Sequence, residues 1–264
     1  MELNHQEITT PVRAAATLVM LRDAPGGLEV FLIRRHGLSD VLGGAYVFPG
    51  GKVDDGDALL DMASHLDDQP QRLHAVLGEP QLDARSAAGI YVTALREGRA
   101  FGDMVAQLQL RLAASQLTPW TRWITPRVPS VMNKRFDTRF FVAAAPAGQL
   151  ASHDNHEATE SVWLRPRAAL QQYWDRAIEL APPQIMSLAQ LSRHDSVASV
   201  LAQARGRLPP VIQPEPFELD GTRILAYPGD PRHPVADRAM PGPTRLHFRN
   251  KRFEPAEGFD GLFA

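Results

Sequence analysis

The sequence contains no cysteine. Disulfide bonds, zinc–thiolate sites and thiol nucleophiles are therefore excluded. No apolar run approaches the roughly 20 residues that a membrane-spanning helix needs. The first residues, MELNHQEITTPVR, also lack the basic start and apolar core of a secretory signal. These absences predict a cytoplasmic protein with no membrane partner.

The chain also carries little net charge. Lysine and arginine number 28 and aspartate and glutamate 30, which gives a formal net charge of −2. Proteins that bind nucleic acid usually show a clear basic excess, so no nucleic-acid partner is expected. With 264 residues, 44% of them hydrophobic, the chain has material for one large domain, or for one domain with additions.

Local patterns predict a mixture of strands and helices. Apolar runs on both sides of the turn DAPGG predict a β-hairpin, and a short strand leads from Tyr46 into Pro49-Gly50-Gly51. Asp83 is placed to cap the start of a helix that would extend to Glu97. Strands are predicted at 12–22, 28–35, 46–48, 122–125, 135–144 and 160–164, and helices at 84–97, 101–112, 167–176, 184–194 and 196–205. This order indicates an α/β fold, an α+β mixed-sheet sandwich.

The stretch from Gly50 to Asp57, GGKVDDGD, joins the glycine turn to three acids. Arg96-Glu97 lies further along the chain, at the end of the predicted helix. Together these residues resemble the Nudix box, in which a glycine and a glutamate are followed by an Arg-Glu pair on a helix. Gly51 matches the box glycine, and Asp57 stands where glutamate is usual. Residues 58–95 replace the short spacer of the common box, and such a long insertion is found in the branch that includes acyl-CoA diphosphatases.

Other segments resemble the same branch in the same order. They are FLIRR (31–35), PWTRWITP (119–126), RFDTRFF (135–141), EATESVWL (157–164) and PGDPRHP (228–234). The resemblance covers nearly the whole chain. It implies a Nudix hydrolase-like domain over residues 1–206, with the insertion at about 58–88, and a proline-rich extension over 207–264 that packs on it. The extension is expected to form a small β-hairpin flap.

The resemblance implies a metal-dependent hydrolase. Nudix enzymes use water and Mg²⁺ or Mn²⁺ to split a small-molecule nucleoside diphosphate derivative, and here CoA or acyl-CoA is the leading substrate. Hard cations of this kind prefer oxygen ligands. The implied metal site comprises Glu97, Gly50 and Asp57. The implied catalytic residues are Glu97, Arg96, which braces the glycine turn, and Glu157. The implied substrate-binding residues are Arg35, Arg135 and Gly51, and a homodimer is a further family expectation.

The second half of the box departs from the family pattern. Ala100 and Phe101 stand where a glutamate pair is expected, and Asp103 stands where glycine is expected. The chain reads as though a segment between Glu97 and Gly98 were lost. The alternative interpretation is therefore a catalytically impaired Nudix-fold protein with a nucleotide-binding or regulatory role. A third interpretation is the defective product of a damaged gene.

Structural readings compete with several of these roles. The two glycines also suit a plain turn, Asp57 a solvated loop, and Glu160 is an alternative to Glu157. Arg135 and Arg139 alternate with Asp137 on one strand, which favours structural ion pairs with Asp137 or other acids over phosphate contacts. Trp120, Trp123 and Trp163 are expected in the core rather than in a stacking site, and Pro228-Gly229-Asp230 as a structural turn.

Overall fold

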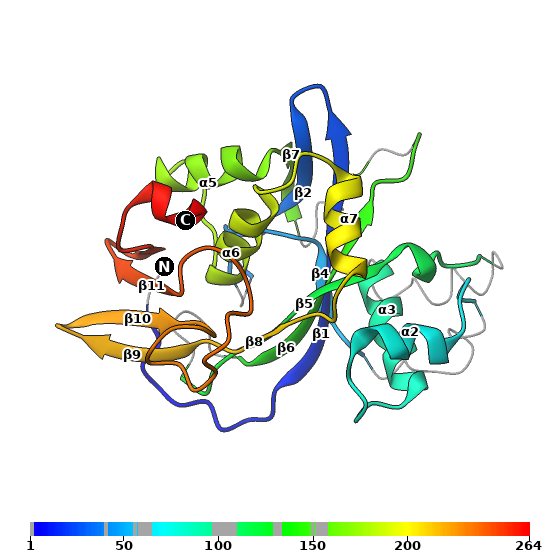
Figure 1. Cartoon of the computed structure of the whole chain (residues 1–264), viewed down its shortest axis with the longest axis horizontal. Helices are drawn as coiled ribbons and strands as arrows, with labels where there is room; N and C mark the ends of the chain where they lie inside the picture. Colours follow the sequence, from blue (N-terminus) through cyan, green and yellow to red (C-terminus); the bar gives the residue numbers. More distant parts are fainter. Residues whose placement is uncertain are drawn as a thin grey trace.

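A computed structural model of the chain describes residues 3–39, 42–54, 57, 65–96, 110–128, 134–148, 151 and 158–264. A large mixed sheet runs through the middle of the molecule. Helices α2 (Pro70–Leu77) and α3 (Ala84–Leu95) cover one face of it, and the other face carries α5 (Pro166–Trp174), α6 (Pro182–Leu191) and α7 (Val197–Arg205) (Figure 1). The expected mixed-sheet sandwich is confirmed.

The strands of the large sheet come from the whole length of the chain. They are β1 (Arg13–Ala24), β2 (Gly27–Arg35), β3 (Tyr46–Val47), β4 (Gly50–Lys52), β5 (Thr118–Ile124), β6 (Phe136–Ala144), β7 (Ala158–Leu164) and β8 (Val211–Ile212). The path runs β3-β2-β1-β6-β5-β8, with β4 paired to β1 and β7 paired to β2. β1 and β6 are parallel, as are β5 and β8, whereas the other pairs are antiparallel.

β1 and β2 separate like the arms of a V. They pair with each other only near the hairpin turn, from Leu21 opposite Val30 to Ala24 opposite Gly27. Further from the turn, β4 pairs with the same edge of β1, and β3 pairs with the same edge of β2. The segment Tyr46 to Lys52 therefore fills the space between the two diverging strands. This wedge puts the glycine pair in the middle of the sheet rather than on a peripheral loop.

The two faces of the sheet pack into separate hydrophobic clusters. Ala16 on β1 and Phe141 on β6 pack with residues of α2 and α3. Val19 on β1 and Val142 on β6 face the other way, into a larger cluster that includes five residues of α6. Because side chains alternate along a strand, these memberships fix the face on which each neighbouring residue lies.

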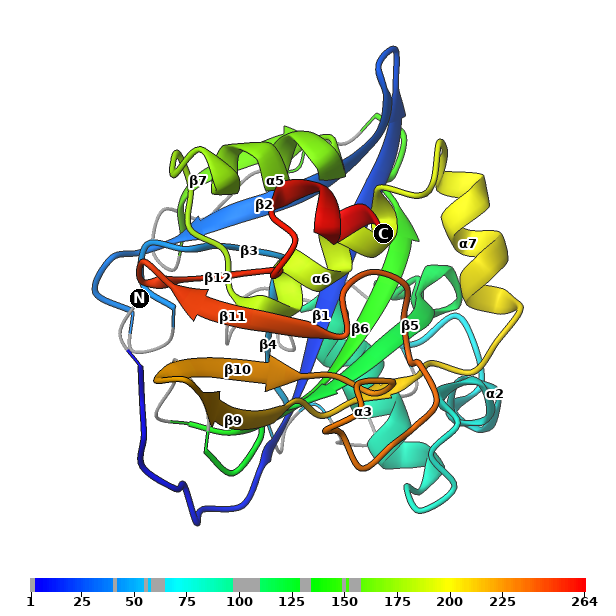
Figure 2. The same cartoon turned by 60° about the vertical axis from the view of Figure 1, so that its left-hand side comes forward.

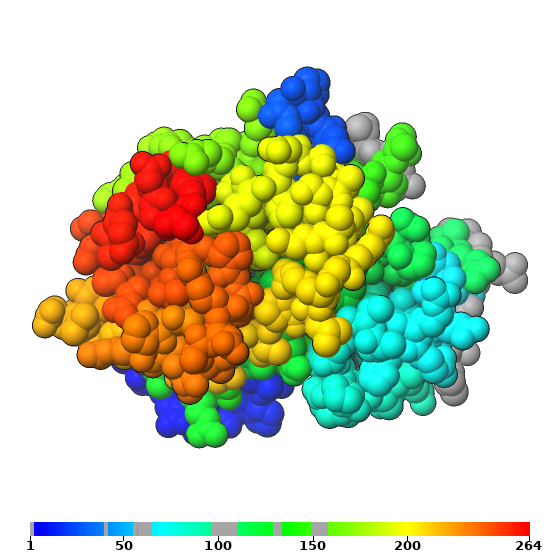
Figure 3. Space-filling view, viewed as in Figure 1, coloured from blue at the N-terminus to red at the C-terminus, as the bar shows by residue number. Residues whose placement is uncertain are grey.

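The C-terminal extension forms a second sheet. Its strands are β9 (Glu215–Leu219), β10 (Thr222–Ala226), β11 (Arg245–Arg249) and β12 (Arg252–Glu254), in the order β12-β11-β10-β9. This sheet lies in front of α6 in Figure 2, and Figure 3 shows the orange and red extension directly against the yellow helical region. Tyr227, Leu246 and Phe253 belong to the larger hydrophobic cluster of the main sheet. The boundary at residue 206 stays a prediction, but the extension shares its core with the rest of the chain.

Several element bounds differ from the sequence expectation. The helix predicted to reach Glu97 ends at Leu95, and Arg96 has extended backbone with φ −83° and ψ 137°. Leu112, predicted in a helix, instead forms a parallel bridge with Leu66. β5 begins four residues earlier than predicted, because its Thr118 and Pro119 pair with β6. Most of the predicted helix at 101–112 lies outside the described residues.

The expected burial is confirmed for two of the three tryptophans, and the tail turn at Asp230 is structural. Trp120 and Trp123 are buried core residues, as expected. Trp163 is only partly buried, with its ring 5.2 Å from that of Phe31 and the Arg22 guanidinium 4.4 Å from its centroid. Asp230 is a structural turn residue, because its carboxylate binds Arg245 at 2.6 and 2.9 Å. Among the described residues, none of the helices combines the length and the apolar character of a membrane span.

Candidate active site

The two glycines of the wedge have different surroundings. Gly50 lies opposite Thr17 and Gly51 opposite Ala16 in the antiparallel pairing of β4 with β1. A Cβ on Gly50 would press against the Ala16 carbonyl oxygen and lie 2.8 Å from Thr17 Cα, whereas a Cβ on Gly51 would meet nothing within 4 Å. Gly50 is therefore required by packing. Gly51 is free of that constraint and lies on the face that α3 covers.

Helix α3 carries the second part of the site. Asp83 caps its start, with Oδ1 accepting a hydrogen bond of 2.8 Å from the Ser86 amide, as the sequence predicts. The residues from Ala87 to Ala94 are all buried. Tyr91 packs its ring 4.6 Å from that of Phe141 on β6. The helix is thus held flat on the sheet and ends where Arg96 points at the wedge.

Arg96 joins the helix to the segment after the glycines. Its Nη1 lies 2.9 Å from Asp54 Oδ2, and its Nη2 donates to the Lys52 carbonyl oxygen at 2.8 Å. Nη2 also lies 3.2 Å from Asp57 Oδ2. One guanidinium group therefore holds three points of the loop, which are separated from it by the insertion. Only arginine has the planar fork of donors for such a bridge.

Asp57 is a buried anchor of the same loop. It is 6% exposed, and its Oδ2 accepts hydrogen bonds from Thr93 Oγ1 at 2.8 Å and from the Asp54 amide at 2.9 Å. The Asp57 amide in turn donates to the Asp54 carbonyl oxygen at 2.9 Å. Buried charges need such partners, because an unpaired carboxylate in the interior is strongly unfavourable. Its predicted role as a metal ligand stays a prediction.

Asp54 forms ion pairs with two cationic side chains, Lys52 and Arg96. Lys52 Nζ lies 2.9 Å from Asp54 Oδ1, on the side opposite to Arg96. The hydrogen bonds from Lys52 and then from Arg96 lower the pKa of the Asp54 carboxyl below its ordinary value. The carboxylate is therefore ionised at neutral pH, and both cations are partly neutralised by it.

Arg35 lies at the end of β2, beside the start of β7. Arg34 pairs with Tyr46, which packs in the larger cluster, so alternation places Arg35 on the opposite face, the one that α3 covers. Its Nε is buried and has no hydrogen-bond partner among the described residues. A buried guanidinium nitrogen without a partner is costly, which makes Arg35 a candidate for binding an anion. Its backbone pairs with Ala158 at the start of β7.

The other predicted basic residue has structural contacts. Arg135 Nε donates to the carbonyl oxygens of Thr125 and Pro126, both at 3.1 Å. These bonds join the end of β5 to the start of β6. Its predicted role in substrate binding stays a prediction, and the contacts of its side chain do not favour it over Arg35.

Two predicted catalytic residues, Glu97 and Glu157, lie outside the described residues. Glu97 follows Arg96 directly, and Glu157 precedes Ala158, the residue paired with Arg35. Glu160 is described, and it lies on the other face of the sheet. There it is opposite Arg34 and hydrogen-bonded to Tyr46, whose pKa is raised to about 12, first by burial and then by this bond.

The described residues alone do not make a metal site. Within the ranges described above, no three histidine, aspartate or glutamate side chains are gathered so as to hold a metal ion. Among the described residues, Asp54 and Asp57 are the carboxylates nearest to the glycines in sequence, and both are bound to Arg96. A divalent ion would need further oxygen ligands, and the predicted ligand Glu97 is the first residue beyond α3 that could supply one.

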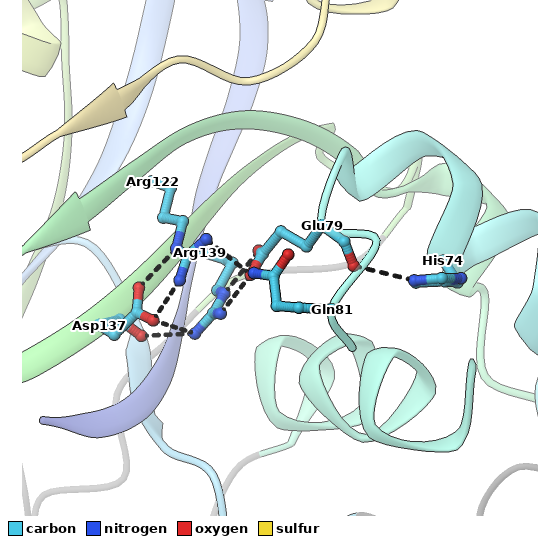
Figure 4. A network of polar contacts seen from close by, with 6 residues as sticks. All are labelled: His74, Glu79, Gln81, Arg122, Asp137 and Arg139. Carbon is cyan, nitrogen blue, oxygen red and sulfur yellow. Dashed lines mark hydrogen bonds and ion pairs between the residues drawn. The ribbon is translucent and has the colours of Figure 1, made fainter. Parts of the chain in front are cut away.

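A buried ion network beside the site was missed from the sequence. Glu79, in the insertion, is 4% exposed and binds Arg139 Nε at 2.9 Å and Arg122 Nη1 at 2.8 Å. Asp137 bridges the two arginines from the other side, and its hydrogen bond with Arg122 raises the pKa of that guanidinium. Figure 4 shows this alternation of charges. The pairing of Asp137 with Arg139 was expected from strand periodicity, whereas nothing local marks Glu79.

Comparisons with known proteins agree with this geometry. A family profile described as the NUDT19 Nudix domain matches residues 69–191. Over 76 residues the chain is 38% identical to acyl-coenzyme A diphosphatase NUDT19 of Xenopus laevis, an alignment that covers 28% of this chain and 20% of that protein. Over 234 residues it is 24% identical to putative nudix hydrolase 7 of Caenorhabditis elegans, covering 85% of this chain and 75% of the relative.

The fold also matches a solved structure. The crystal structure of a NUDIX hydrolase from Alicyclobacillus acidocaldarius has a TM-score of 0.62 and 24% identity, and the match covers 76% of this chain and 99% of that one. This match shows that the chain has the Nudix fold, and residues 69–191 match the Nudix domain family.

Proposed function

We propose that this chain hydrolyses the diphosphate bond of a nucleoside diphosphate joined to a second group, with CoA or acyl-CoA as the leading substrate. The observation that carries the proposal is the Arg96 bridge, because it brings both parts of an interrupted box together across the insertion. The similarity to an acyl-coenzyme A diphosphatase, over a fifth of that protein's length, supports the substrate class.

The proposed roles follow from where the side chains lie. Bound Mg²⁺ or Mn²⁺ would polarise the phosphate and lower the pKa of the attacking water. Glu97 and the backbone at Gly50 would hold that ion, with Asp57 as the further predicted ligand. Gly51 would let the diphosphate approach the backbone closely, since a glycine there leaves open space on the α3 face.

Two further residues would act on the substrate itself. Arg35 would bind a phosphate oxygen through the guanidinium group whose Nε has no partner among the described residues. Glu157, just before the strand that pairs with Arg35, would assist the water or the metal. Water would add to one phosphorus and the bond to the bridging oxygen would break, which gives two phosphate products. A cytoplasmic location and a homodimer stay predictions.

The test is hydrolysis of CoA, ADP-ribose and NADH with Mg²⁺ or Mn²⁺, beside the variant Glu97→Gln. Turnover that depends on the metal and falls in the variant supports the proposal. No turnover of any diphosphate by the wild-type chain would refute it.

The second candidate is a nucleotide-binding protein without catalysis. Ala100 and Phe101 favour it, because they stand in place of the glutamates that bind metal in the family. Calorimetry separates the two functions. Binding of CoA or ADP-ribose that persists in EDTA, with no hydrolysis, supports the binding protein, whereas binding that needs the metal and ends in products supports the enzyme.

A further inference from the structure

The insertion is bonded to α3 and to the segment that follows α3 in the chain. Near its start, Leu66 bridges Leu112, and the Asp67 carboxylate accepts bonds from the amide and hydroxyl of Ser115 at 2.8 and 2.5 Å. In its middle, the Leu73 carbonyl oxygen accepts a bond from Tyr91 on α3 at 3.3 Å. The insertion is therefore fixed to the helix and to the segment before β5.

The insertion also contacts the sheet through a set of ion pairs made by Glu79. Glu79 follows α2 and precedes the cap of α3, and its two carboxylate oxygens bind Arg139 at 2.9 and 2.5 Å. Arg122 adds a third contact from β5 at 2.8 Å. The Glu79 carbonyl oxygen also bonds to the ring of His74 at 3.0 Å, so both ends of this residue are held (Figure 4).

Strand register relates this network to the glycine wedge. Arg139 on β6 lies opposite Ala16 on β1, and Ala16 lies opposite Gly51 on β4. All three residues are on the face that α3 covers. Two strand spacings separate Arg139 from Gly51, which is roughly 10 Å along the sheet. The Glu79 network and the Arg96 bridge thus hold the two ends of one helix against the same short stretch of sheet.

We infer that Glu79 is a positioning residue for the diphosphate site, an inference that rests on the proposed function. Glu79 fixes the start of α3 on β5 and β6, and α3 then sets where Arg96 meets Lys52, Asp54 and Asp57. Loss of the Glu79 carboxylate frees the start of the helix and shifts the residues at its end. Displacement of a catalytic group by about 1 Å is enough to lower turnover by about 100-fold.

The experiment separates positioning from stability with two variants. Glu79→Gln leaves two buried arginines with one acid. The double variant Glu79→Gln, Arg122→Gln restores the balance of buried charge with one arginine and one acid, but the neutral side chain at position 79 keeps only a weakened contact with Arg139. The matched control is Glu29→Gln, which breaks a partly exposed ion pair with Arg22 at the hairpin tip, away from α3.

The readouts are kcat, KM and Mn²⁺ affinity with CoA, each measured well below the unfolding temperature of every variant. In the double variant we expect thermal stability to recover relative to Glu79→Gln, while kcat stays at least about tenfold below wild type. The control should match wild type in kcat. If stability and kcat recover together in the double variant, or if kcat never falls, Glu79 is only structural and the inference is wrong.

A second readout keeps this test separate from the proposed function. Amide hydrogen exchange at Val53 and Asp57 reports directly on the loop, since these amides bond to Ala14 and Asp54. Exchange at least about tenfold faster in the double variant than in the control supports positioning even if wild type turns over no diphosphate. Unchanged exchange refutes it. Absence of turnover in wild type refutes only the enzymatic proposal.

Discussion

The two adjacent glycines offer a matched pair of substitutions with opposite expected effects. In Gly50→Ala, the new methyl group meets the Ala16 carbonyl oxygen and Thr17 Cα, which are backbone atoms in the middle of a sheet. Neither can move without breaking the pairing of β1 with β4. Overpacking of this kind costs about 1–3 kcal/mol. For a chain of this size, such a loss lowers the melting temperature by roughly 2–12 °C.

Gly51→Ala is the control on the same strand. Its methyl group meets nothing within 4 Å, and Gly51 has no positive φ. Alanine there restricts the unfolded chain and stabilises the fold by about 0.4–1 kcal/mol. Turnover should nevertheless fall, because the methyl group occupies the space through which the diphosphate approaches.

Urea unfolding of both variants, with CoA hydrolysis measured in parallel, checks this pair. The expected outcome is a stability loss confined to Gly50→Ala and, in Gly51→Ala, an activity loss without a stability loss. A Gly50→Ala protein as stable as wild type would refute the packing argument. Full activity in Gly51→Ala would remove the reason for assigning that glycine to the substrate.

Four further substitutions test the contacts of the wedge and of the residues next to it. Arg96→Lys leaves a single ammonium for three acceptors and should cost about 1–3 kcal/mol in urea unfolding, while Thr93→Val, which keeps the shape but removes a donor, should cost a similar amount. Lys52 and Arg96 lower the pKa of Asp54 below 3.8. The ionised carboxylate therefore stabilises the folded protein above pH 3.8, and this contribution is lost as the pH falls through the lowered pKa. Asp54→Asn should flatten the acid limb of the curve of unfolding free energy against pH. Because burial raises the pKa of Tyr46 from 10.0 to about 12, stability should fall as the pH rises through that interval, and Tyr46→Phe should remove this part of the alkaline loss.

The helices and strands predicted best are those in which apolar residues recur at the spacing of a strand or a helix. The hairpin, β6 and the three helices after β7 match their predicted positions within a few residues, because alternating or helical apolar patterns reflect the face that each element buries. β4 carries no such pattern. Two glycines and a lysine form a strand there only because β1 and β2 diverge and leave an edge to be paired.

The sequence predicted those site residues that lie within a short motif or match the family's box. The bridging of the loop by Arg96 was expected from the box, and its partners Asp54 and Asp57 were within the quoted stretch. Thr93 and Glu79 were not predicted. Glu79 meets its partners only after the chain has added β5 and β6, and a lone glutamate in a polar segment looks like any solvated acid.

The parallel pairing of β1 with β6 has a consequence for how the chain is made. Arg13 pairs with Phe136, so the edge of β1 that β6 covers stays bare while more than a hundred further residues are synthesised. Pairings of such long range form slowly, and a bare strand edge is a template for wrong partners. The larger core also waits for Leu246 and Phe253 near the end of the chain. The edge of β1 is therefore exposed during much of synthesis, and chaperones that shield strand edges should raise the yield more than those that act after collapse.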